Sequence, residues 1–268
     1  MPIFQHKGRL HYFAHVPKCG GSSVENMLTE RFGTLAFLDR SYLRRKPAFL
    51  RWSRSSPQHI TWDEFRRVVP EDWITSAFVV VRHPLARVVS AYHHAYTRGY
   101  IPGLQSIESW FNQSITLMET DIGLFDRHLL PQVDFLPDSA EVFQLENGLN
   151  AVSDWLDATF GVSGQGGLPH ELQSSRKIAS DVARRTPTKV SSALRDRVAD
   201  YYARDFARLG YDPYDPDTAN LDVYTPRPAA YGLRAHARLA KTTLMFNTRI
   251  SLIRMNRELR TLQDWFNG

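Results

Sequence analysis

A short apolar run followed by a proline constrains the fold of this chain more than any other feature. Residues 77–81 read AFVVV, the longest uninterrupted apolar stretch among 268 residues. A β-branched run of this length is typical of a strand that is buried on both faces of a parallel sheet. Pro84 follows where the first turn of a helix favours proline, and the helical pattern continues to about Tyr96. Because parallel strands require crossover connections, usually helices, the chain is predicted to be an α/β protein.

The rest of the chain alternates strand and helix patterns in the same way. Strands are predicted at residues 11–16, 34–38 and 142–145, and helices at residues 22–32, 61–69, 150–160 and 191–209. Thr61, followed three residues later by Glu64, is a capping box for the helix that begins there. Gly210 ends the last helix, and a proline-rich stretch beyond it marks a boundary. We therefore expect a parallel sheet with helices on both faces in residues 1–211, followed by a linker and a helical extension in residues 212–268.

The net charge of +5 lies entirely in the last part of the sequence. Residues 1–229 hold 26 Lys and Arg against 26 Asp and Glu, whereas residues 230–268 hold seven against two. This distribution, without a helix-turn-helix, zinc-finger or RNP pattern, argues against a nucleic-acid-binding domain. Cys19 is the only cysteine, so an internal disulfide is excluded and a reducing, cytoplasmic setting is expected. No apolar stretch approaches the roughly 20 residues of a membrane span, and the first residues do not resemble a secretory signal.

Two segments have the composition of phosphate-binding elements. The first, HVPKCGGSS at residues 15–23, joins a predicted strand to a predicted helix. Its glycines let the backbone approach an anion, the helix start offers N–H groups, and Lys18 adds a positive charge. Ser22 and Ser23 are expected to cap the helix and to donate to phosphate oxygens. A Walker A loop has its lysine after the glycines, whereas Lys18 precedes them, which disfavours an ATPase or a GTPase. The segment therefore predicts a P-loop-like, but not a Walker-type, site.

The second segment begins at Arg82, just past the strand predicted at residues 77–81. Ligands of open α/β sheets bind at this end of the strands, and a forked guanidinium suits a phosphate. Arg87, Ser90 and His94 are predicted to share one face of the following helix. Arg82 and Ser90 are therefore candidates for a second phosphate, with a structural ion pair as the alternative for Arg82.

Together these segments resemble two motifs of one enzyme family. HVPKCGGSSVE is similar to the 5′-phosphosulfate loop, and VVVRHPLARVVSAYHHAY to the 3′-phosphate motif, of sulfotransferases that use 3′-phosphoadenosine 5′-phosphosulfate (PAPS). The branch that it most resembles contains carbohydrate sulfotransferases such as heparan sulfate 2-O-sulfotransferase and bacterial relatives. Weaker similarity around residues 128–136, 168–176 and 201–211 extends the resemblance over about residues 10–211. A P-loop kinase and a non-catalytic nucleotide-binding protein are the remoter alternatives.

The resemblance implies a reaction and a donor site. PAPS would supply a sulfuryl group to a hydroxyl, or less readily an amine, of a carbohydrate or glycan, leaving 3′,5′-ADP. The alternative acceptors are a lipid headgroup and a small-molecule alcohol. Lys18 would contact the 5′-phosphosulfate and Arg82 and Ser90 the 3′-phosphate. The other residues implied at the donor site are Cys19, Gly20, Gly21, Ser22 and Ser23, with Ser174, Ser175 and Arg176 as weaker candidates. The family commonly has Thr at the position of Cys19 and Asp at that of His83, and we interpret Cys19 as a small packing residue.

The acceptor side requires a base to remove a proton, and this scheme requires no metal. His59 is the candidate, because it precedes the capped helix and lies some 20 residues before Arg82, as the base does in the 2-O-sulfotransferase branch. The alternative bases are His15, His94, His128, His170 and Glu25. A basic and aromatic segment precedes His59, and it is either an acceptor-binding surface or a solvated face with its aromatic rings in the core. The acceptor-binding candidates are Arg44, Arg45, Arg51, Trp52, His94 and His128.

The last 39 residues read as a basic amphipathic helix or helical hairpin. Three roles are open for residues 230–268: packing onto the main domain, forming a homodimer, and attachment to anionic lipid at the inner face of a membrane. The predicted location is therefore cytoplasmic, with peripheral membrane contact as one alternative.

Overall fold

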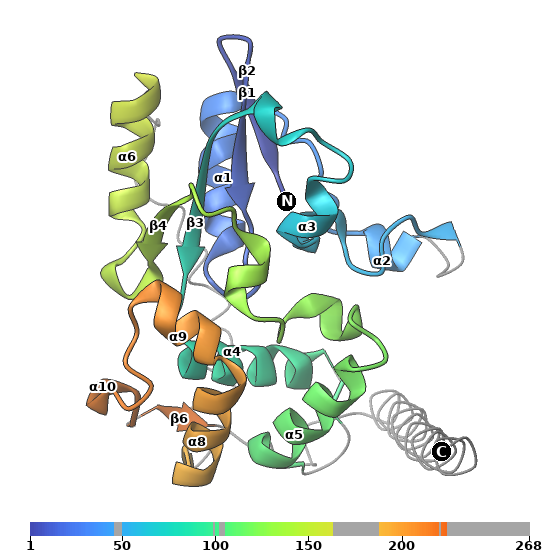
Figure 1. Cartoon of the computed structure of the whole chain (residues 1–268), viewed down its shortest axis with the longest axis vertical. Coiled ribbons are helices and arrows are strands. Elements are labelled where there is room, and N and C mark those ends of the chain that lie inside the picture. Colours follow the sequence, from blue (N-terminus) through green and yellow to red (C-terminus); the bar gives the residue numbers. More distant parts are fainter. Residues whose placement is uncertain (46–49, 99, 102–104, 163–187, 220, 224–268) are drawn as a thin grey trace, which may run out of the picture.

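A four-stranded sheet lies at the centre of the computed structural model, with helices on both sides (Figure 1). The structure describes residues 1–45, 50–98, 100–101, 105–162, 188–219 and 221–223. The sheet order is β1 (Ile3–His6), β2 (Arg9–Ala14), β3 (Ile74–Val81) and β4 (Glu141–Gln144). The pairs β2–β3 and β3–β4 are parallel, and β1 is antiparallel to β2. This arrangement confirms the predicted α/β class.

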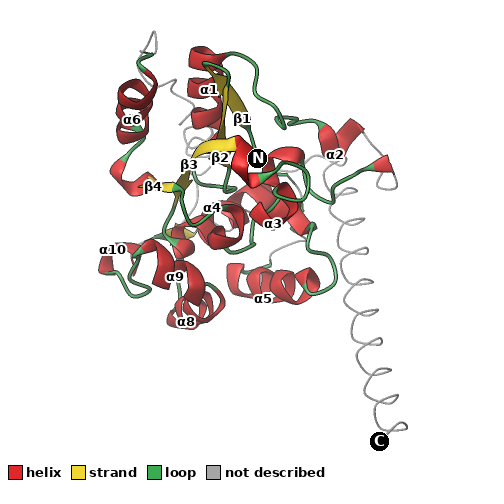
Figure 2. Ribbon diagram, turned by 45° about the horizontal axis from the view of Figure 1, so that its top comes forward, coloured by secondary structure: helices red, strands yellow, loops and turns green. Residues whose placement is uncertain are grey.

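The helices form two layers because β3 is apolar on both faces. Phe78 and Val80 pack in a cluster with α1 (Gly21–Phe32) and α6 (Asn150–Phe160). Val79 and Val81 belong to a second cluster on the opposite face, together with side chains of the remaining longer helices. Those helices are α4 (Pro84–Thr97), α5 (Ile107–Met118), α8 (Ser192–Tyr201) and α9 (Ala203–Leu209). Figure 2 shows α1 and α6 on one side of the sheet and α4, α5, α8 and α9 on the other.

Short elements fill the connections. The helices of a single turn are α2 (Tyr42–Arg45), α3 (Trp62–Phe65) and α10 (Pro216–Ala219). The 3₁₀ turns are η2 (Pro57–His59), η3 (Glu71–Trp73), η4 (Leu124–Arg127), η5 (Gln132–Phe135) and η6 (Leu145–Asn147). A two-stranded sheet pairs β5 (Thr188–Lys189) with β6 (Asp222–Val223).

Several predicted elements have different bounds. The strand predicted at 11–16 is β2, which a left-handed turn at Lys7 and Gly8 joins to β1, a strand that the sequence analysis missed. Residues 34–38 form only an isolated bridge between Ala36 and Ile3. The predicted capping box is present, with Thr61 and Glu64 bonded reciprocally, but α3 ends at Phe65 rather than near residue 69.

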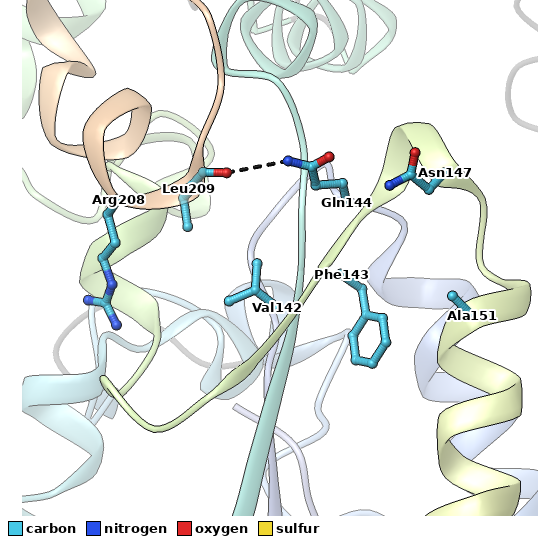
Figure 3. Close-up of a pocket in the computed structure, with 7 residues that line it drawn as sticks. All are labelled: Val142, Phe143, Gln144, Asn147, Ala151, Arg208 and Leu209. Carbon is cyan, nitrogen blue, oxygen red and sulfur yellow. Dashed lines mark hydrogen bonds between the residues drawn. The ribbon is translucent and has the colours of Figure 1, made fainter.

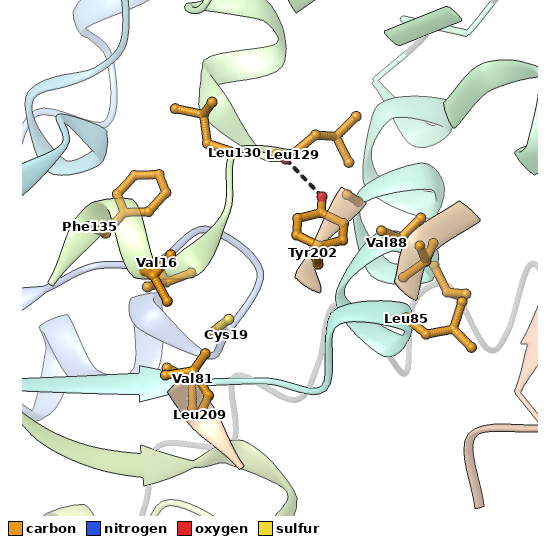
Figure 4. Close-up of a cluster of buried hydrophobic side chains, with 14 of the residues drawn as sticks. Val16, Cys19, Val81, Leu85, Val88, Leu129, Leu130, Phe135, Tyr202 and Leu209 are labelled. Atoms are coloured by element: carbon orange, nitrogen blue, oxygen red, sulfur yellow. Dashed lines mark hydrogen bonds between the residues drawn. The ribbon is translucent and has the colours of Figure 1, made fainter. Parts of the chain in front are cut away.

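The helix predicted at 191–209 is two helices, because the backbone leaves helical geometry at Tyr202. This side chain is fully buried, and its hydroxyl donates to the carbonyl of Leu129 at 2.8 Å (Figure 4). The predictions for residues 230–268, for His170, and for Ser174, Ser175 and Arg176 lie outside the described residues. Among the helices that the structure describes, none has both the length and the apolar character needed to cross a membrane.

Candidate functional site

The loop between β2 and α1, which the sequence predicts to bind an anion and which we call the anion-binding loop, contains two left-handed residues. Lys18 and Gly20 both adopt left-handed conformations, with φ of 70° and 79°. A non-glycine residue seldom adopts this conformation, so the surrounding structure must hold Lys18 in place. Gly20 is the N-cap of α1, and no side chain caps the helix. The predicted serine caps are therefore wrong: Ser22 and Ser23 are the second and third residues of the helix. Their hydroxyls do not satisfy the helix start, where the first amides lack acceptors within the helix.

Gly21 is required by a neighbouring side chain. A Cβ atom at position 21 would lie 2.0 Å from Nε2 of His15, far inside the contact distance. The His15 ring is held there because its Nδ1 lies 2.6 Å from Oε1 of Glu25, one turn into α1. Arg40 donates to the other oxygen of the same carboxylate at 2.7 Å. Burial opposes ionisation of Glu25, but His15 and Arg40 outweigh it and lower the pKa of this carboxyl to about 2.

Lys18 and Arg82 meet at the end of the sheet. Nη1 of Arg82 donates to the carbonyl oxygen of Lys18 at 3.5 Å, so the two predicted phosphate-binding segments are in contact. Burial, and then the charge of Arg82, lowers the pKa of Lys18 to about 8. An anion bound next to Lys18 would favour the charged form of this amine.

Gln132 joins the two segments, and the sequence analysis missed its role. Its Oε1 accepts from the backbone N–H of Arg82 at 2.9 Å, and its Nε2 donates to the carbonyl of Arg82 at 2.8 Å. Cys19 Sγ lies 3.3 Å from the same Oε1. The backbone N–H of Gln132 donates to Asp205 at 2.9 Å, and the glutamine side chain is fully buried. An isolated glutamine has no sequence pattern, and only the weak family similarity of residues 128–136 could have pointed to it.

Cys19 lies in the apolar core beside Val16 and Val81 (Figure 4). Burial raises the pKa of its thiol to about 12, so it remains a neutral thiol. This supports its interpretation as a packing residue.

His83, which stands where the family commonly has aspartate, caps helix α4. Its Nδ1 accepts from the backbone N–H of Leu85 at 3.2 Å, which makes His83 the N-cap of α4. Its Nε2 lies 2.9 Å from the carbonyl of Asp212. A neutral imidazole with the proton on Nε2 satisfies both bonds, so this departure from the family pattern keeps the helix start intact.

The residues predicted to share one face of α4 differ in their burial. The Arg87 side chain is 1% exposed and donates to the carbonyls of His128 and Leu130, so it supports the segment that carries these residues. Ser90 and His94 are half-buried on the same helix.

Four histidines from separate parts of the chain form one cluster. The His59 ring lies 4.7 Å from that of His15 and 5.7 Å from that of His128, and the His94 ring lies 4.9 Å from that of His128. Burial lowers the pKa of His94 to about 3, and the charge of Lys18 is the next cause. Burial, His59 and Lys18 together lower the pKa of His128. The cluster therefore reaches from His59 to the lysine of the anion-binding loop.

The one group of described residues with the composition of a metal site belongs to this cluster. His59, Asp126 and His128 each offer a ligand atom within 4.8 Å of the others. Nδ1 of His59 is 2.8 Å from Oδ2 of Asp126, whereas two ligands of a tetrahedral zinc ion are separated by roughly 3.3 Å. In this structure the two residues are hydrogen-bonded to each other rather than spaced to bind one metal ion.

The basic segment before His59 divides into surface and structural residues. Arg44 is exposed and, with Arg40, lines a surface cavity of about 530 Å³. Trp52 is 54% exposed, with its ring against those of Phe37 and Tyr42. Arg51 instead donates to the carbonyl of Leu43 at 2.7 Å. The side chain of Arg45 lies outside the described part of the structure.

A second surface cavity, of about 370 Å³, lies along the edge of β4 (Figure 3). Gln144 crosses it to donate to the carbonyl of Leu209 at 3.3 Å. None of the residues predicted for the site lines this cavity, so the functional candidates remain at the end of the sheet.

Comparison with protein families matches residues 4–212 to the sulfotransferase family. Neither the curated proteins nor the solved structures gave a significant match. The family match spans more than half of the chain, and it contains the anion-binding loop, Arg82 and all four clustered histidines. The chain therefore belongs to the sulfotransferase family.

Proposed function

We propose that this chain transfers a sulfuryl group from PAPS to a hydroxyl, or less readily an amine, of a carbohydrate or glycan. The observation that carries the proposal is the contact between Lys18 and Arg82, since it places the residues of two phosphate motifs side by side. The loop amides and Lys18 suit the 5′-phosphosulfate, and Arg82 with Ser90 suits the 3′-phosphate. The residues present therefore fit this donor.

In this scheme the protein aligns the acceptor with the donor, neutralises the charge on the leaving phosphate and removes the acceptor's proton. The acceptor oxygen forms a bond to sulfur as the bond from sulfur to the 5′-phosphate oxygen breaks, and 3′,5′-ADP leaves. Lys18 stabilises the charge that gathers on the leaving phosphate. His59 accepts the acceptor's proton, and no step requires a metal.

The contacts of Glu25 and His15 make these two residues weaker candidates for the base than His59. Glu25 is bonded to His15 and Arg40 through both oxygens, and its lowered pKa makes it a weak base. His15 is bonded to Glu25 and packed against Gly21. His94 and His128 lie in the same cluster and are the remaining alternatives among the described residues.

For the acceptor, we propose a sugar chain that approaches over the basic segment. The exposed Trp52 and Arg44 support this, because aromatic and cationic side chains together suit an anionic glycan. A lipid headgroup and a small-molecule alcohol are the second candidates. Incubating the protein with sulfur-labelled PAPS and separated glycan, lipid and small-molecule fractions would show which class becomes labelled.

Donor selectivity is the first test. We expect 3′,5′-ADP to bind more tightly than ATP, because we assign Arg82 and Ser90 to a 3′-phosphate that ATP lacks. Calorimetric titration of each nucleotide measures this preference. Arg82→Ala is expected to weaken 3′,5′-ADP binding by about 1.5–3 kcal/mol, the range for a hydrogen bond to a charged group, and to leave ATP binding less affected. A preference for ATP in the wild-type protein would exclude the proposed donor.

Proton uptake on binding is the second test. In the free protein, burial and the charge of Arg82 lower the pKa of Lys18 to about 8, so part of the population is neutral at this amine near pH 8. A bound phosphate favours the charged amine, and binding of 3′,5′-ADP at pH 8 should therefore take up protons. Titrations in buffers of different ionisation enthalpy measure the uptake. Lys18→Arg carries a charge that does not titrate, and it should abolish most of the uptake. Equal uptake by the two proteins would show that Lys18 does not face the phosphate.

A further inference from the structure

Asp126 holds His59 from a part of the chain that lies 67 residues away. Its Oδ2 lies 2.8 Å from Nδ1 of His59. Burial opposes ionisation of Asp126, but the charge and hydrogen bond of His59 outweigh it and lower the pKa of this carboxyl. An ionised carboxylate can only accept hydrogen bonds, so Nδ1 of His59 carries the proton. In the neutral ring Nε2 is then the nitrogen with a free lone pair, which is the form that a base requires.

Ser56 fixes the carboxylate from the other side. Its backbone N–H donates to Oδ1 of Asp126 at 2.6 Å, and its hydroxyl lies 2.7 Å from Oδ2. The same hydroxyl lies 3.1 Å from Nδ1 of His59. A nucleophilic serine would instead contact Nε2 of the histidine. Ser56 is buried and bonded to the carboxylate, so it orients the pair and is not a nucleophile.

The backbone that presents Asp126 is held in an unfavourable conformation. Phe125, Asp126 and Arg127 all have positive φ, at 49°, 54° and 64°. Non-glycine residues adopt this conformation rarely and mostly as single residues, so three in succession must be held by their surroundings. Strain of this kind concentrates at functional sites, where it fixes a side chain that the relaxed backbone would not present.

An ion pair supplies that restraint and ties it to the base. The Arg127 side chain is 1% exposed and forms a two-pronged bond to Glu64, with Nη2 at 2.6 Å from Oε1. Nη1 of Arg127 also lies 3.4 Å from the carbonyl of His59. Glu64 belongs to the capping box that begins α3, two residues after His59. The residue after Asp126 is therefore fastened to the segment that carries His59.

We propose that Asp126 is the positioning residue of the base: it selects the ring form and the orientation in which Nε2 of His59 accepts the acceptor's proton. Its strained loop is held for this purpose by the pair of Arg127 and Glu64. This inference rests on the proposed function, because it assumes that His59 is the base.

The test replaces the carboxylate without changing its size. In Asp126→Asn the amide cannot stabilise a protonated His59, and it favours the wrong ring form. We expect kcat to fall at least about tenfold, toward the ~10⁴-fold seen when the corresponding aspartate of a Ser-His-Asp triad is replaced by asparagine. The KM for PAPS should stay near the wild-type value, because Asp126 does not contact the donor loop. The pH–rate profile should change as well, because the carboxylate that bonds the His59 ring is lost. Asp126→Glu should restore part of kcat.

A matched control separates positioning from general damage. Asp157 is likewise a carboxylate with a basic partner, Arg31 at 3.0 Å, but it lies on α6 away from the histidine cluster. Asp157→Asn should leave kcat and the pH profile unchanged. If Asp126→Asn keeps the wild-type kcat and pH profile in a folded protein, the positioning role is excluded.

A spectroscopic readout does not depend on turnover. The Nδ1 proton of His59 should give a downfield proton resonance in the wild-type protein, assigned by its absence in His59→Gln. The resonance should disappear or move in Asp126→Asn and persist in Asp157→Asn. A resonance unaffected by Asp126→Asn would overturn the inference. A wild-type chain that shows the expected resonances but transfers no sulfuryl group would overturn the proposed function alone, and would still support the pairing of Asp126 with His59.

Discussion

Lys18→Ala is expected to lower the rate of sulfuryl transfer by about 10²–10³-fold, the loss that follows removal of one donor to a developing anion. Lys18 lies in the loop that begins α1, in contact with Arg82 through its own carbonyl. Its left-handed backbone fixes where the side chain starts, and its charge has no carboxylate partner among the described ion pairs. The measurement is single-turnover transfer from PAPS by purified, folded protein.

Lys7 offers the control for this variant. It is an exposed lysine with a positive φ of 48°, so Lys7→Ala makes the same chemical change at a similar backbone conformation. It lies in the β1–β2 turn, where no predicted site residue is found, and we expect its rate to match the wild type. If Lys18→Ala also turns over within a few-fold of the wild type, Lys18 has no place in the mechanism.

His59→Ala is expected to lower kcat by about 10²–10⁴-fold, the usual contribution of a positioned base. Binding of 3′,5′-ADP should be nearly unchanged, because His59 is hydrogen-bonded to Asp126 and meets the proposed donor loop only through the ring of His15. The His59 side chain is 9% exposed, so His59→Gln, which fills more of the space than alanine, should be measured beside it. Both variants are expected to lose transfer, and a nucleotide-binding measurement on each verifies that the donor site has folded.

Variants of the neighbouring histidines test whether His59 is the base. His94→Gln and His128→Gln should lower kcat less than His59→Gln does. His6→Gln is the matched control, because His6 packs against Phe32 and Phe160 on the other face of the sheet. If His94→Gln or His128→Gln loses the most activity, that residue and not His59 is the base.

The parts of the fold that could be predicted are those that local sequence determines. The apolar run at 77–81 and the proline at 84 predict β3 and α4 because both signals lie within their own elements. The capping box at Thr61 is correct for the same reason. The break at Tyr202 could not be predicted, because it goes with the burial of this side chain and its hydrogen bond to the distant Leu129.

The candidate site divides in the same way. Lys18, Arg82 and His59 lie in segments with a recognisable sequence pattern. Asp126 is 67 positions from His59, the residue that it holds. Gln132 is 50 positions from Arg82 and 113 from Cys19. No sequence rule predicts that Phe125, Asp126 and Arg127 adopt left-handed conformations in succession. The residues proposed to act on the donor and the acceptor could therefore be predicted from the sequence, but the residues that hold them in place could not.

The imidazole packed against Gly21 changes how a glycine pair in such a loop should be interpreted. Gly20 is required by its positive φ, whereas Gly21 is required because the His15 ring occupies the space of a methyl group. The two adjacent glycines are thus required for different reasons: the first by its backbone conformation, and the second by a side chain six positions earlier. A pair of glycines before a helix is therefore weak evidence for an anion-binding site when taken alone. The second glycine can be required by a packed side chain, as it is here by His15. In this chain a change at position 21 would be tolerated only together with a smaller residue at position 15, so the two positions form one unit of substitution.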